Sequence, residues 1–424
     1  MKPNSAGLAG PGVVVLFFAL KIGSAIALLT ASTAWMSVDN FATFTQLMIL
    51  TALLNLAAIG GAQSGLVKMT AASADLAAIA RVQGAAYLVW ITLFAVLIVL
   101  FWAFRDAVSI ALVGDTRVAA VVPLIALLVL ASGPGQIFTS ILTGRHRPAV
   151  SMLAQTGGLV ASTVGALWFL HQGNAAVAAV AFAAGPLVTM AIAFPAYLTE
   201  RLPRPSLKEL RGDIRHLLSY SGATAVLAVG GALILFALRA VYRDSFGLET
   251  LAFWLAASRI SDTTTQFLGL AILQLFLPRY SAANNQVERR HLILVTSVTS
   301  ALLMGGGLVL FGVASEFWVG LLLSPAYRPA TTGILLYMIG DLLRVTAAVA
   351  MNVQLANGRP WRYAAIEVAT LVLMATICLA GIARGEPLAP MIAYVAAYTV
   401  TALIVCWQFA RDSMAVRTSR VNEQ

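Results

Sequence analysis

Long apolar stretches alternate with short polar segments along the whole chain. A helix needs roughly 20 apolar residues to cross the hydrocarbon core of a bilayer. The windows that meet this length lie at residues 12–36, 41–65, 83–104, 118–142, 149–170, 175–198, 217–240, 249–277, 292–314, 328–356, 362–383 and 388–410. The pattern therefore predicts an all-α membrane protein with about twelve transmembrane helices.

The most highly charged polar interruption, Glu200 to Arg215, divides these windows into two groups of six. Two six-helix halves around a central joint are typical of pseudo-symmetric transporters. Part of the joint, Leu207 to Leu218, is predicted to form a short amphipathic helix on the membrane surface. We expect an N-terminal six-helix bundle, a cytoplasmic joint, a C-terminal six-helix bundle and a cytoplasmic tail, at residues 1–198, 199–216, 217–410 and 411–424. The part of the tail from Ser413 to Gln424 is expected to be disordered.

The composition excludes an ordinary soluble domain. Of the 424 residues, 60% are hydrophobic and 10% are charged, whereas typical soluble domains have about 45–50% and about 25%. The mean hydropathy of +0.88 agrees with a bilayer environment. The first window continues past Lys21, so we predict a retained helix there and not a cleaved signal peptide.

The distribution of basic residues predicts the orientation in the membrane. Of the 27 Lys and Arg residues, 18 fall in the termini and in the loops predicted on the same side, 5 fall in the opposite loops, and 4 lie inside windows. Cytoplasmic loops carry the excess of Lys and Arg, so both termini are expected in the cytoplasm. The net charge of +10 suits anionic lipid, and no nucleic-acid partner is expected.

The sequence contains no pattern typical of an enzyme, a metal site or a cofactor site. Cys378 and Cys406 both lie in apolar windows, and the four histidines are far apart in the chain. There is no phosphate-binding loop, no serine–histidine–aspartate set and no metal-ligand spacing. We therefore expect neither catalysis, nor a bound metal, nor a cofactor.

Charged residues do occur inside the predicted spans, where each costs about 2.5–3.5 kcal/mol on insertion scales. Such residues normally face the protein interior or a water-filled cavity. Lys21 and Arg259 lie about 15 Å into their windows, near the bilayer centre, whereas Arg239 and Glu367 lie near window ends and are able to reach the interface. The predicted substrate-binding cations are Lys21, Arg239, Arg259 and Arg344, and the predicted coupling or orienting acids are Asp262, Asp341 and Glu367.

Helical spacing leaves two interpretations of these charges open. Arg259 with Asp262, and Asp341 with Arg344, have the i,i+3 spacing of ion pairs that neutralise each other and fix helix packing. Alternatively, the cations form a basic cavity for an anionic head group, since arginine grips phosphate with two parallel hydrogen bonds. Lys21 favours the cavity, because no acid lies in its own window.

Further polar residues and one tryptophan are candidates for lining such a cavity. Glycines near Gln63 favour close helix packing as an alternative. Tryptophans near window ends are typical interfacial anchors, but Trp254 lies one or two turns inside its window. The possible lining residues are Gln46, Asn55, Gln63, Trp254, Gln266 and Asn352.

Several short motifs resemble those of the O-antigen and enterobacterial-common-antigen flippases. The most specific is Arg259-Ile-Ser-Asp262 followed by Leu277-Pro278-Arg279-Tyr280-Ser281, and the next is Ile339-Gly340-Asp341-Leu342-Leu343-Arg344. Weaker matches are Phe44-Thr45-Gln46-Leu47 at the start of the second window, Gly65-Leu66-Val67-Lys68 at its exit, Lys21-Ile22-Gly23, and Gly144-Arg145.

This resemblance implies membership of the multidrug/oligosaccharidyl-lipid/polysaccharide (MOP) exporter superfamily. Its members have two six-helix bundles that form a V, the fold of the MATE transporters. The resemblance also implies a function: movement of an undecaprenyl-pyrophosphate-linked glycan from the cytoplasmic to the periplasmic leaflet of the bacterial inner membrane. Alternating access through a cationic central cavity is the implied mechanism, and glycan polymerase or ligase machinery the implied partner. The charged family positions correspond to Lys21, Arg259, Asp262, Asp341 and Arg344.

Two other functions compete with a flippase. A cation-coupled multidrug exporter of the MATE type needs a buried acid for coupling, and Lys21 stands in the first window where an acid would suit that task. A membrane-embedded glycan polymerase or ligase usually carries a large periplasmic loop, and the predicted outside loops are all short.

Overall fold

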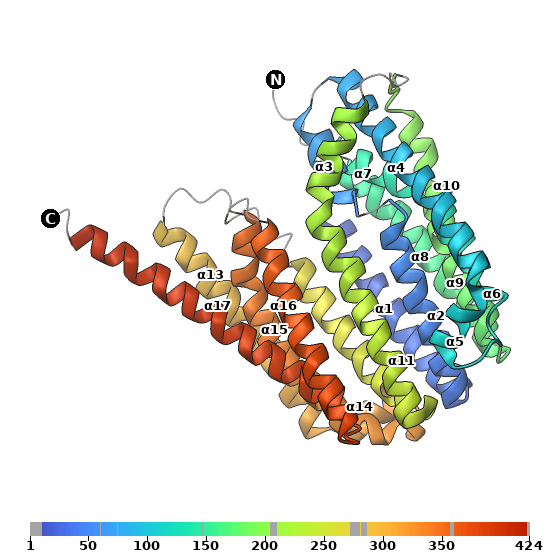
Figure 1. The fold of residues 1–424 in the computed structure, drawn as a ribbon. Helices are drawn as coiled ribbons and strands as arrows, with labels where there is room; N and C mark the ends of the chain where they lie inside the picture. Colours follow the sequence, from blue (N-terminus) through green and yellow to red (C-terminus); the bar gives the residue numbers. More distant parts are fainter. Residues whose placement is uncertain are drawn as a thin grey trace. The chain divides into compact units, whose positions relative to one another are not determined.

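The computed structural model describes residues 11–59, 61–73, 75–145, 147–203, 210–271, 280, 286–356 and 360–421. Regular structure in these residues is helical throughout (Figure 1). Several predicted features lie outside the described residues: 204–209 of the joint, the motif residues 277–279 and 281, and the side chains of Lys68 and Gln266. The chain divides into two compact units, Met1–Phe236 and Ala237–Gln424.

The first unit is a bundle of mostly apolar helices that precede a long helix, α11. Its helices are α1 (Pro11–Trp35), α2 (Val38–Ala57), α3 (Gln63–Ala72), α4 (Leu76–Ala103), α5 (Arg105–Val113), α6 (Val121–Ala131), α7 (Gly133–Gly144), α8 (Pro148–His171), α9 (Ala175–Ala183) and α10 (Gly185–Leu198). The predicted second window is interrupted between α2 and α3, where Gly61 takes a φ of 70°. Helices α6 with α7, and α9 with α10, together form single apolar stretches, Val121–Gly144 and Ala175–Leu198.

Helix ends in this unit follow local capping chemistry. The Ser37 side chain accepts a hydrogen bond from the Asn40 backbone N–H at the start of α2. Asp75 accepts from two backbone N–H groups at the start of α4. Gly114 closes α5 in the left-handed conformation, with φ 91°, which a glycine adopts without steric cost.

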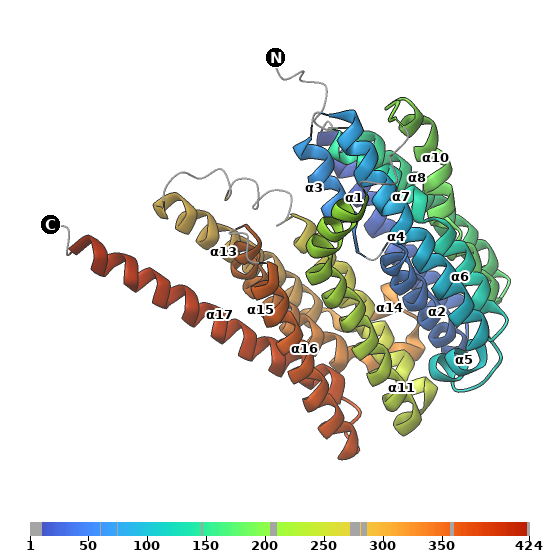
Figure 2. The same cartoon turned by 45° about the horizontal axis from the view of Figure 1, so that its top comes forward.

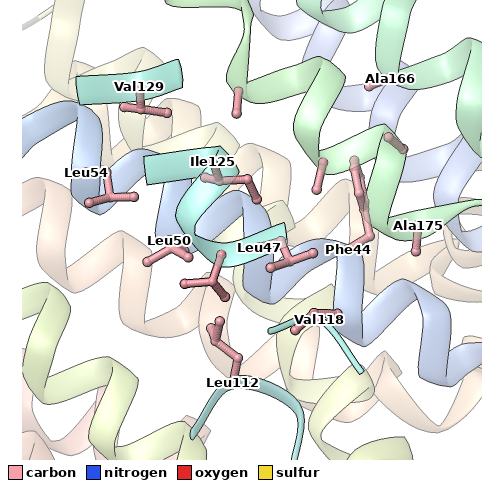
Figure 3. Close-up of a cluster of buried hydrophobic side chains, with 14 of the residues drawn as sticks. Phe44, Leu47, Leu50, Leu54, Leu112, Val118, Ile125, Val129, Ala166 and Ala175 are labelled. Carbon is pink, nitrogen blue, oxygen red and sulfur yellow. The ribbon is translucent and has the colours of Figure 1, made fainter. Parts of the chain in front are cut away.

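The core of the first unit is an apolar cluster between α2, α6, α8 and α9. Phe44, Leu47, Leu50 and Leu54 recur at helical spacing along α2 and pack against Ile125 and its neighbours (Figure 3). The outward faces are also apolar, since Trp102 is 66% and Trp168 is 65% exposed. Large exposed apolar surfaces suit a lipid environment and not water.

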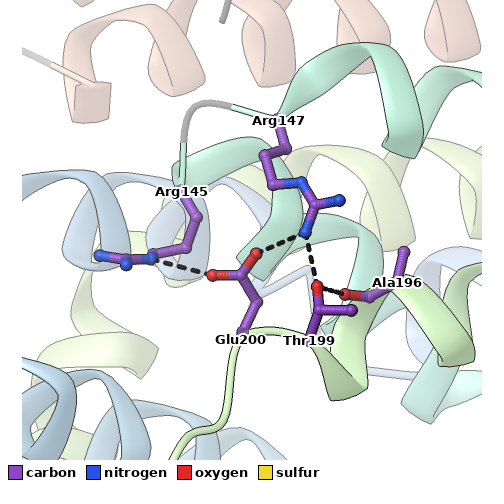
Figure 4. A network of polar contacts seen from close by, with 5 residues as sticks. All are labelled: Arg145, Arg147, Ala196, Thr199 and Glu200. Carbon is purple, nitrogen blue, oxygen red and sulfur yellow. Dashed lines mark hydrogen bonds and ion pairs between the residues drawn. The ribbon is translucent and has the colours of Figure 1, made fainter. Parts of the chain in front are cut away.

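An ion-pair network lies at one end of the first unit. Glu200, just after α10, accepts from Arg145 Nε at 3.2 Å and from Arg147 Nη1 at 2.9 Å (Figure 4). Arg147 Nη1 also donates to Thr199 Oγ1 at 2.7 Å. These arginines come from the α7–α8 connection, so the network ties that connection to the end of α10.

The second unit contains most of α11 (Leu210–Ala271) from Ala237 onward and the helices that follow it. These are α13 (Gln286–Val313), α14 (Ser315–Leu322), the 3₁₀ helix η3 (Pro325–Ala330), α15 (Thr331–Ala356), α16 (Pro360–Ala383) and α17 (Ala389–Val421). Helix α15 packs against α13 and α17, and α16 packs against α17. The helices α15, α16 and α17 lie together in both views (Figure 1 and Figure 2).

Two expectations about helix boundaries are wrong. The loop expected between windows 217–240 and 249–277 is a single sharp break in α11 at Gly247, with φ 85° and ψ 169°. Glycine supplies this conformation without a Cβ clash, so no longer connection is needed. The segment expected to be disordered from Ser413 onward continues α17 to Val421, because its Ala, Arg and Met residues are good helix formers.

Nine helical stretches in the described part of the chain are long and apolar enough to cross a membrane. They coincide with nine of the predicted windows. The other windows, 12–36, 217–240 and 249–277, fall on α1 and α11. The multi-pass membrane character is therefore clear, while the count of twelve and the orientation of the termini stay predictions.

Candidate functional site

Asp341 of α15 is the centre of a buried polar cluster in the second unit. Its side chain is 0% exposed. The Ser261 hydroxyl, from α11, donates to Asp341 Oδ1 at 2.7 Å, and the Tyr394 hydroxyl, from α17, donates to the same oxygen at 2.7 Å. The second oxygen, Oδ2, is buried and has no hydrogen-bond partner among the described residues. One carboxylate thus ties three helices together and keeps acceptor capacity.

Arg344 lies one helical turn after Asp341 but does not pair with it directly in the described structure. Its Nη1 donates to the Tyr394 hydroxyl at 3.3 Å, and its guanidinium carbon lies 5.4 Å from the centre of the Tyr398 ring. Tyr394 therefore stands between the acid and the cation. A tyrosine hydroxyl from α17 thus bridges Asp341 and Arg344, while the charge of Arg344 still interacts with the Asp341 carboxylate. The neutralising pair considered from the sequence stays one interpretation of these two residues.

A second part of the cluster is built on Trp254 of α11. The Trp254 indole N–H donates to the Tyr337 hydroxyl at 2.6 Å, and the Arg239 guanidinium carbon lies 5.7 Å from the Trp254 ring centre. Trp254 is 1% and Arg239 6% exposed. The expectation that Arg239 reaches the membrane interface is wrong, because its guanidinium packs over a buried indole.

Ring contacts join the two parts into one cluster. The centres of the Tyr337 and Tyr394 rings lie 4.8 Å apart, and those of Tyr394 and Tyr398 also lie 4.8 Å apart. We call Arg239, Trp254, Ser261, Tyr337, Asp341, Arg344, Tyr394 and Tyr398 the tyrosine–arginine cluster. The charge of Asp262 interacts with those of both Arg239 and Arg259. The charge of Glu367 interacts with that of Arg344.

The hydrogen bond described for Asn352 does not involve the tyrosine–arginine cluster. Its side-chain amide donates to the Ala348 carbonyl at 2.8 Å, within its own helix, and the residue is buried. This bond satisfies one of the two amide N–H donors within the helix itself. The expectation that Asn352 lines a cavity stays a prediction.

The first unit holds Lys21 and a separate polar cavity. Lys21 is half-buried on α1. The cavity has a volume of about 760 Å³ and is lined by α2, α3, α7 and α8. Asn55 and Gln63 line it, whereas Gln46 is buried in the core of α2 with its Oε1 unpartnered among the described residues.

Sequence reasoning overlooked the tyrosines, and it noted Ser261 only as part of the Arg259-Ile-Ser-Asp262 motif. A signal for them existed: Tyr394 and Tyr398, like Tyr337 and Asp341, are spaced four residues apart and so share a helix face. Gly340 was a further signal, because a Cβ there would overlap atoms of the Tyr394 ring. A glycine inside a helix is one indication of the close approach of a neighbouring group.

A comparison with protein-family models supplies the family. The model described as polysaccharide biosynthesis protein matches residues 35–332, which is more than half of the chain. The chain belongs to this polysaccharide biosynthesis family. The matched region contains the whole polar cavity of the first unit, together with Arg239, Trp254 and Ser261. Asp341, Arg344 and Tyr394 follow it. A search of curated proteins found no match.

Solved structures show the fold of this family member. It is similar to the lipid II flippase MurJ in an inward closed conformation, with a TM-score of 0.72, 11% identity, and coverage of 94% of this chain and 86% of that chain. It is similar to an inward-facing multidrug resistance MATE transporter of the MOP superfamily, with a TM-score of 0.68, 14% identity, and coverage of 93% and 94%.

A third solved structure has the same fold. It is a MOP superfamily transporter from Pyrococcus furiosus, described as having a binding pocket of reverse polarity, with a TM-score of 0.60, 13% identity and 94% coverage of both chains. At these identities the likeness shows the fold alone. The predicted all-helical MATE-like membrane fold and the polysaccharide-biosynthesis class are thereby confirmed, while the narrower O-antigen or common-antigen assignment stays a prediction.

Proposed function

We propose that this polysaccharide biosynthesis protein is a flippase for a polyprenyl-pyrophosphate-linked oligosaccharide. It would move the glycolipid from the cytoplasmic to the periplasmic leaflet of a bacterial inner membrane by alternating access. The observation that carries the proposal is Arg344, a half-buried cation in an apolar helix bundle, which contacts two tyrosines and has no direct carboxylate partner in the described structure.

The chemistry of the substrate explains why such a cation is useful. A pyrophosphate is too highly charged to cross hydrocarbon unaided, because an unpaired charge in an apolar medium is very costly. A guanidinium has five N–H donors, and Tyr394 accepts only one of them in the described structure. The remaining donors suit a phosphate, which arginine binds with two parallel hydrogen bonds.

Other predicted residues take secondary roles in this proposal. Within the second unit, Arg259 adds positive charge for the head group, and Asp262 and Glu367 orient the neighbouring arginines. The bilayer holds the polyprenyl tail, so the protein needs to shield only the polar head group. Glycan polymerase or ligase machinery would consume the product on the periplasmic side.

Asp341 gives a specific reason to keep a second function under test. A buried carboxylate with one unpartnered oxygen is the kind of group that a cation-coupled multidrug exporter needs. The fold does not separate the two functions, because the MATE and MurJ structures match with TM-scores of 0.68 and 0.72. A drug-susceptibility assay in a pump-deficient bacterial host tests the exporter directly.

The flippase is tested in proteoliposomes that contain the full chain and a fluorescent polyprenyl-pyrophosphate oligosaccharide. Flipping is read as the fraction of label that an added membrane-impermeant quencher reaches in the outer leaflet. We expect Arg344→Ala to lower the rate by at least about tenfold, the value of one charged hydrogen bond. The matched control is Arg328→Ala, since Arg328 is exposed. Equal rates with and without protein would exclude the flippase.

A further inference from the structure

The polar cavity of the first unit has the size of a small-ligand site, and none of the described residues that line it is charged. Its volume of about 760 Å³ lies within the range of about 300–1,000 Å³ for ligand pockets. Apolar carbon atoms of Leu56, Ile59 and Val67 form part of its wall. Among the described residues, the polar lining consists of amides and hydroxyls, from Asn55, Gln63, Gln136, Thr139, Ser140, Thr143, Ser151 and Gln155.

The hydroxyl groups of this lining present oxygen acceptors to the cavity. Thr139, Ser140 and Thr143 each donate to a backbone carbonyl of α7, at 3.0, 2.7 and 2.8 Å. Ser151, from α8, donates to the Thr139 carbonyl at 3.1 Å. A hydroxyl has one donor and two acceptor lone pairs, so each of these groups keeps acceptor capacity after its hydrogen is used.

The amide groups add both donors and acceptors. Gln136 Nε2 donates to two oxygens of Asn55, the backbone oxygen at 2.7 Å and Oδ1 at 2.8 Å. These bonds fix the Asn55 side chain and leave the N–H donors of Asn55 available to a ligand. Gln155 Nε2 donates to Ser151 Oγ at 3.2 Å, which leaves its carbonyl oxygen. Gln63 is exposed at the start of α3 and offers a complete amide.

We propose that this cavity binds uncharged sugar residues of the transported glycan, an inference that rests on the proposed flippase function. Sugar hydroxyls both donate and accept hydrogen bonds, so they match a wall of amides and hydroxyl oxygens. The C–H faces of a pyranose ring match the apolar wall. A phosphate or a drug cation would lose its hydration there without meeting an opposite charge, so the cavity suits neither.

The test measures binding of short lipids to the full chain in nanodiscs. The probes are farnesyl diphosphate, the same lipid carrying N-acetylglucosamine on its terminal phosphate, and the same lipid carrying glucuronic acid. For the wild type we expect N-acetylglucosamine to tighten binding about tenfold, the value of one to two hydrogen bonds. We expect no gain from glucuronic acid, because its carboxylate would meet no cation.

Variants separate the sugar contacts from the diphosphate contacts. Gln63→Leu with Gln155→Leu should remove the gain from N-acetylglucosamine while binding of farnesyl diphosphate stays unchanged. The control Gln172→Leu, at an exposed amide after α8, should keep the gain. Thr143→Val gives a second, smaller change if the double variant unfolds, as judged by its thermal unfolding temperature.

Three results would overturn the inference while leaving the flippase intact, and two of them concern the N-acetylglucosamine lipid. One is equal wild-type affinity for the bare and the N-acetylglucosamine lipids, and the other is a full gain in both the double variant and Thr143→Val. A gain from glucuronic acid equal to that from N-acetylglucosamine would likewise reject an uncharged-sugar site. Failure of every lipid to bind the wild type would instead reject the flippase function on which the inference rests.

Discussion

The Tyr394 hydroxyl lies 2.7 Å from Asp341 Oδ1, although the two residues are 53 positions apart in the chain. The same hydroxyl accepts from Arg344 at 3.3 Å. The position of the guanidinium therefore depends on that of the carboxylate, because this single oxygen is bonded to both groups. The hydroxyl also connects α15 with α17, the helices that carry most of the tyrosine–arginine cluster.

Replacing Tyr394 tests this bridge. Tyr394→Phe keeps the ring but removes the hydroxyl, so Asp341 and Arg344 each lose a partner in a buried site. We expect a loss of about 1–3 kcal/mol in the free energy of unfolding, the cost of unsatisfied buried polar groups, together with slower flipping. Tyr398→Phe is the control, because it keeps the ring under Arg344. Both quantities are measured on detergent-solubilised protein and in proteoliposomes, and equal behaviour of the two variants would contradict the bridge.

Gly340 tests the close approach of Tyr394 to α15. A Cβ at this position would overlap the Tyr394 ring, so Gly340→Ala should displace the ring and destabilise the protein by about 1–3 kcal/mol, as overpacking does. Gly306→Ala is the matched control, since a Cβ there meets no atom within 4 Å and alanine favours a helix. The midpoints of thermal unfolding should fall for the first variant and stay or rise for the second.

The ion-pair network around Glu200 should contribute little to stability but depend on salt. Arg147 is 39% exposed in its side chain, and pairs near the surface are worth about 0–1 kcal/mol. We expect Glu200→Gln to lower the unfolding temperature only slightly, and to lose the difference from wild type at high salt, where such charges are screened. A large loss that salt does not change would show that Glu200 acts through packing instead.

The orientation predicted from basic residues is open to direct measurement. With Cys378 and Cys406 replaced by serine, Gln172→Cys should react with a membrane-impermeant thiol reagent added to intact spheroplasts, because its loop is predicted outside. Glu288→Cys should react only after the membrane is opened, because its segment is predicted inside. Both side chains are exposed, so a difference in labelling reports the side of the membrane on which each residue lies and not its burial in the protein. The reverse pattern would overturn the positive-inside assignment.

Part of the candidate site was readable from the sequence. Charges inside apolar windows singled out Asp341, Arg344 and Arg239, because burial of a charge demands an explanation. Trp254 was noticed for a similar reason, as a tryptophan away from the interface. The pairing of these residues was not predictable, because the spacing of the three tyrosines and the motif around Ser261 do not say which side chain of another helix each one contacts.

The helices were predictable from the sequence, but some of their boundaries were not. The apolar windows predicted the helices well, since hydropathy over about 20 residues is a property of the chain alone. The break at Gly247 and the interruption before Gln63 were placed less well. Each depends on one or a few residues with unusual backbone angles, and such local geometry leaves little trace in a hydropathy window.

The sequence by itself determined that this chain crosses a membrane many times as helices, because a backbone in lipid must satisfy its hydrogen bonds within each segment. It also determined which charges need a partner. Only the tertiary structure decided which residues are the partners. Tyr394 is the partner of Asp341 and Arg344. Gln136 is the partner of Asn55, and the two are 81 positions apart in the chain. The reason is physical, since side-chain contacts between helices depend on their rotation and register, which local periodicity does not fix.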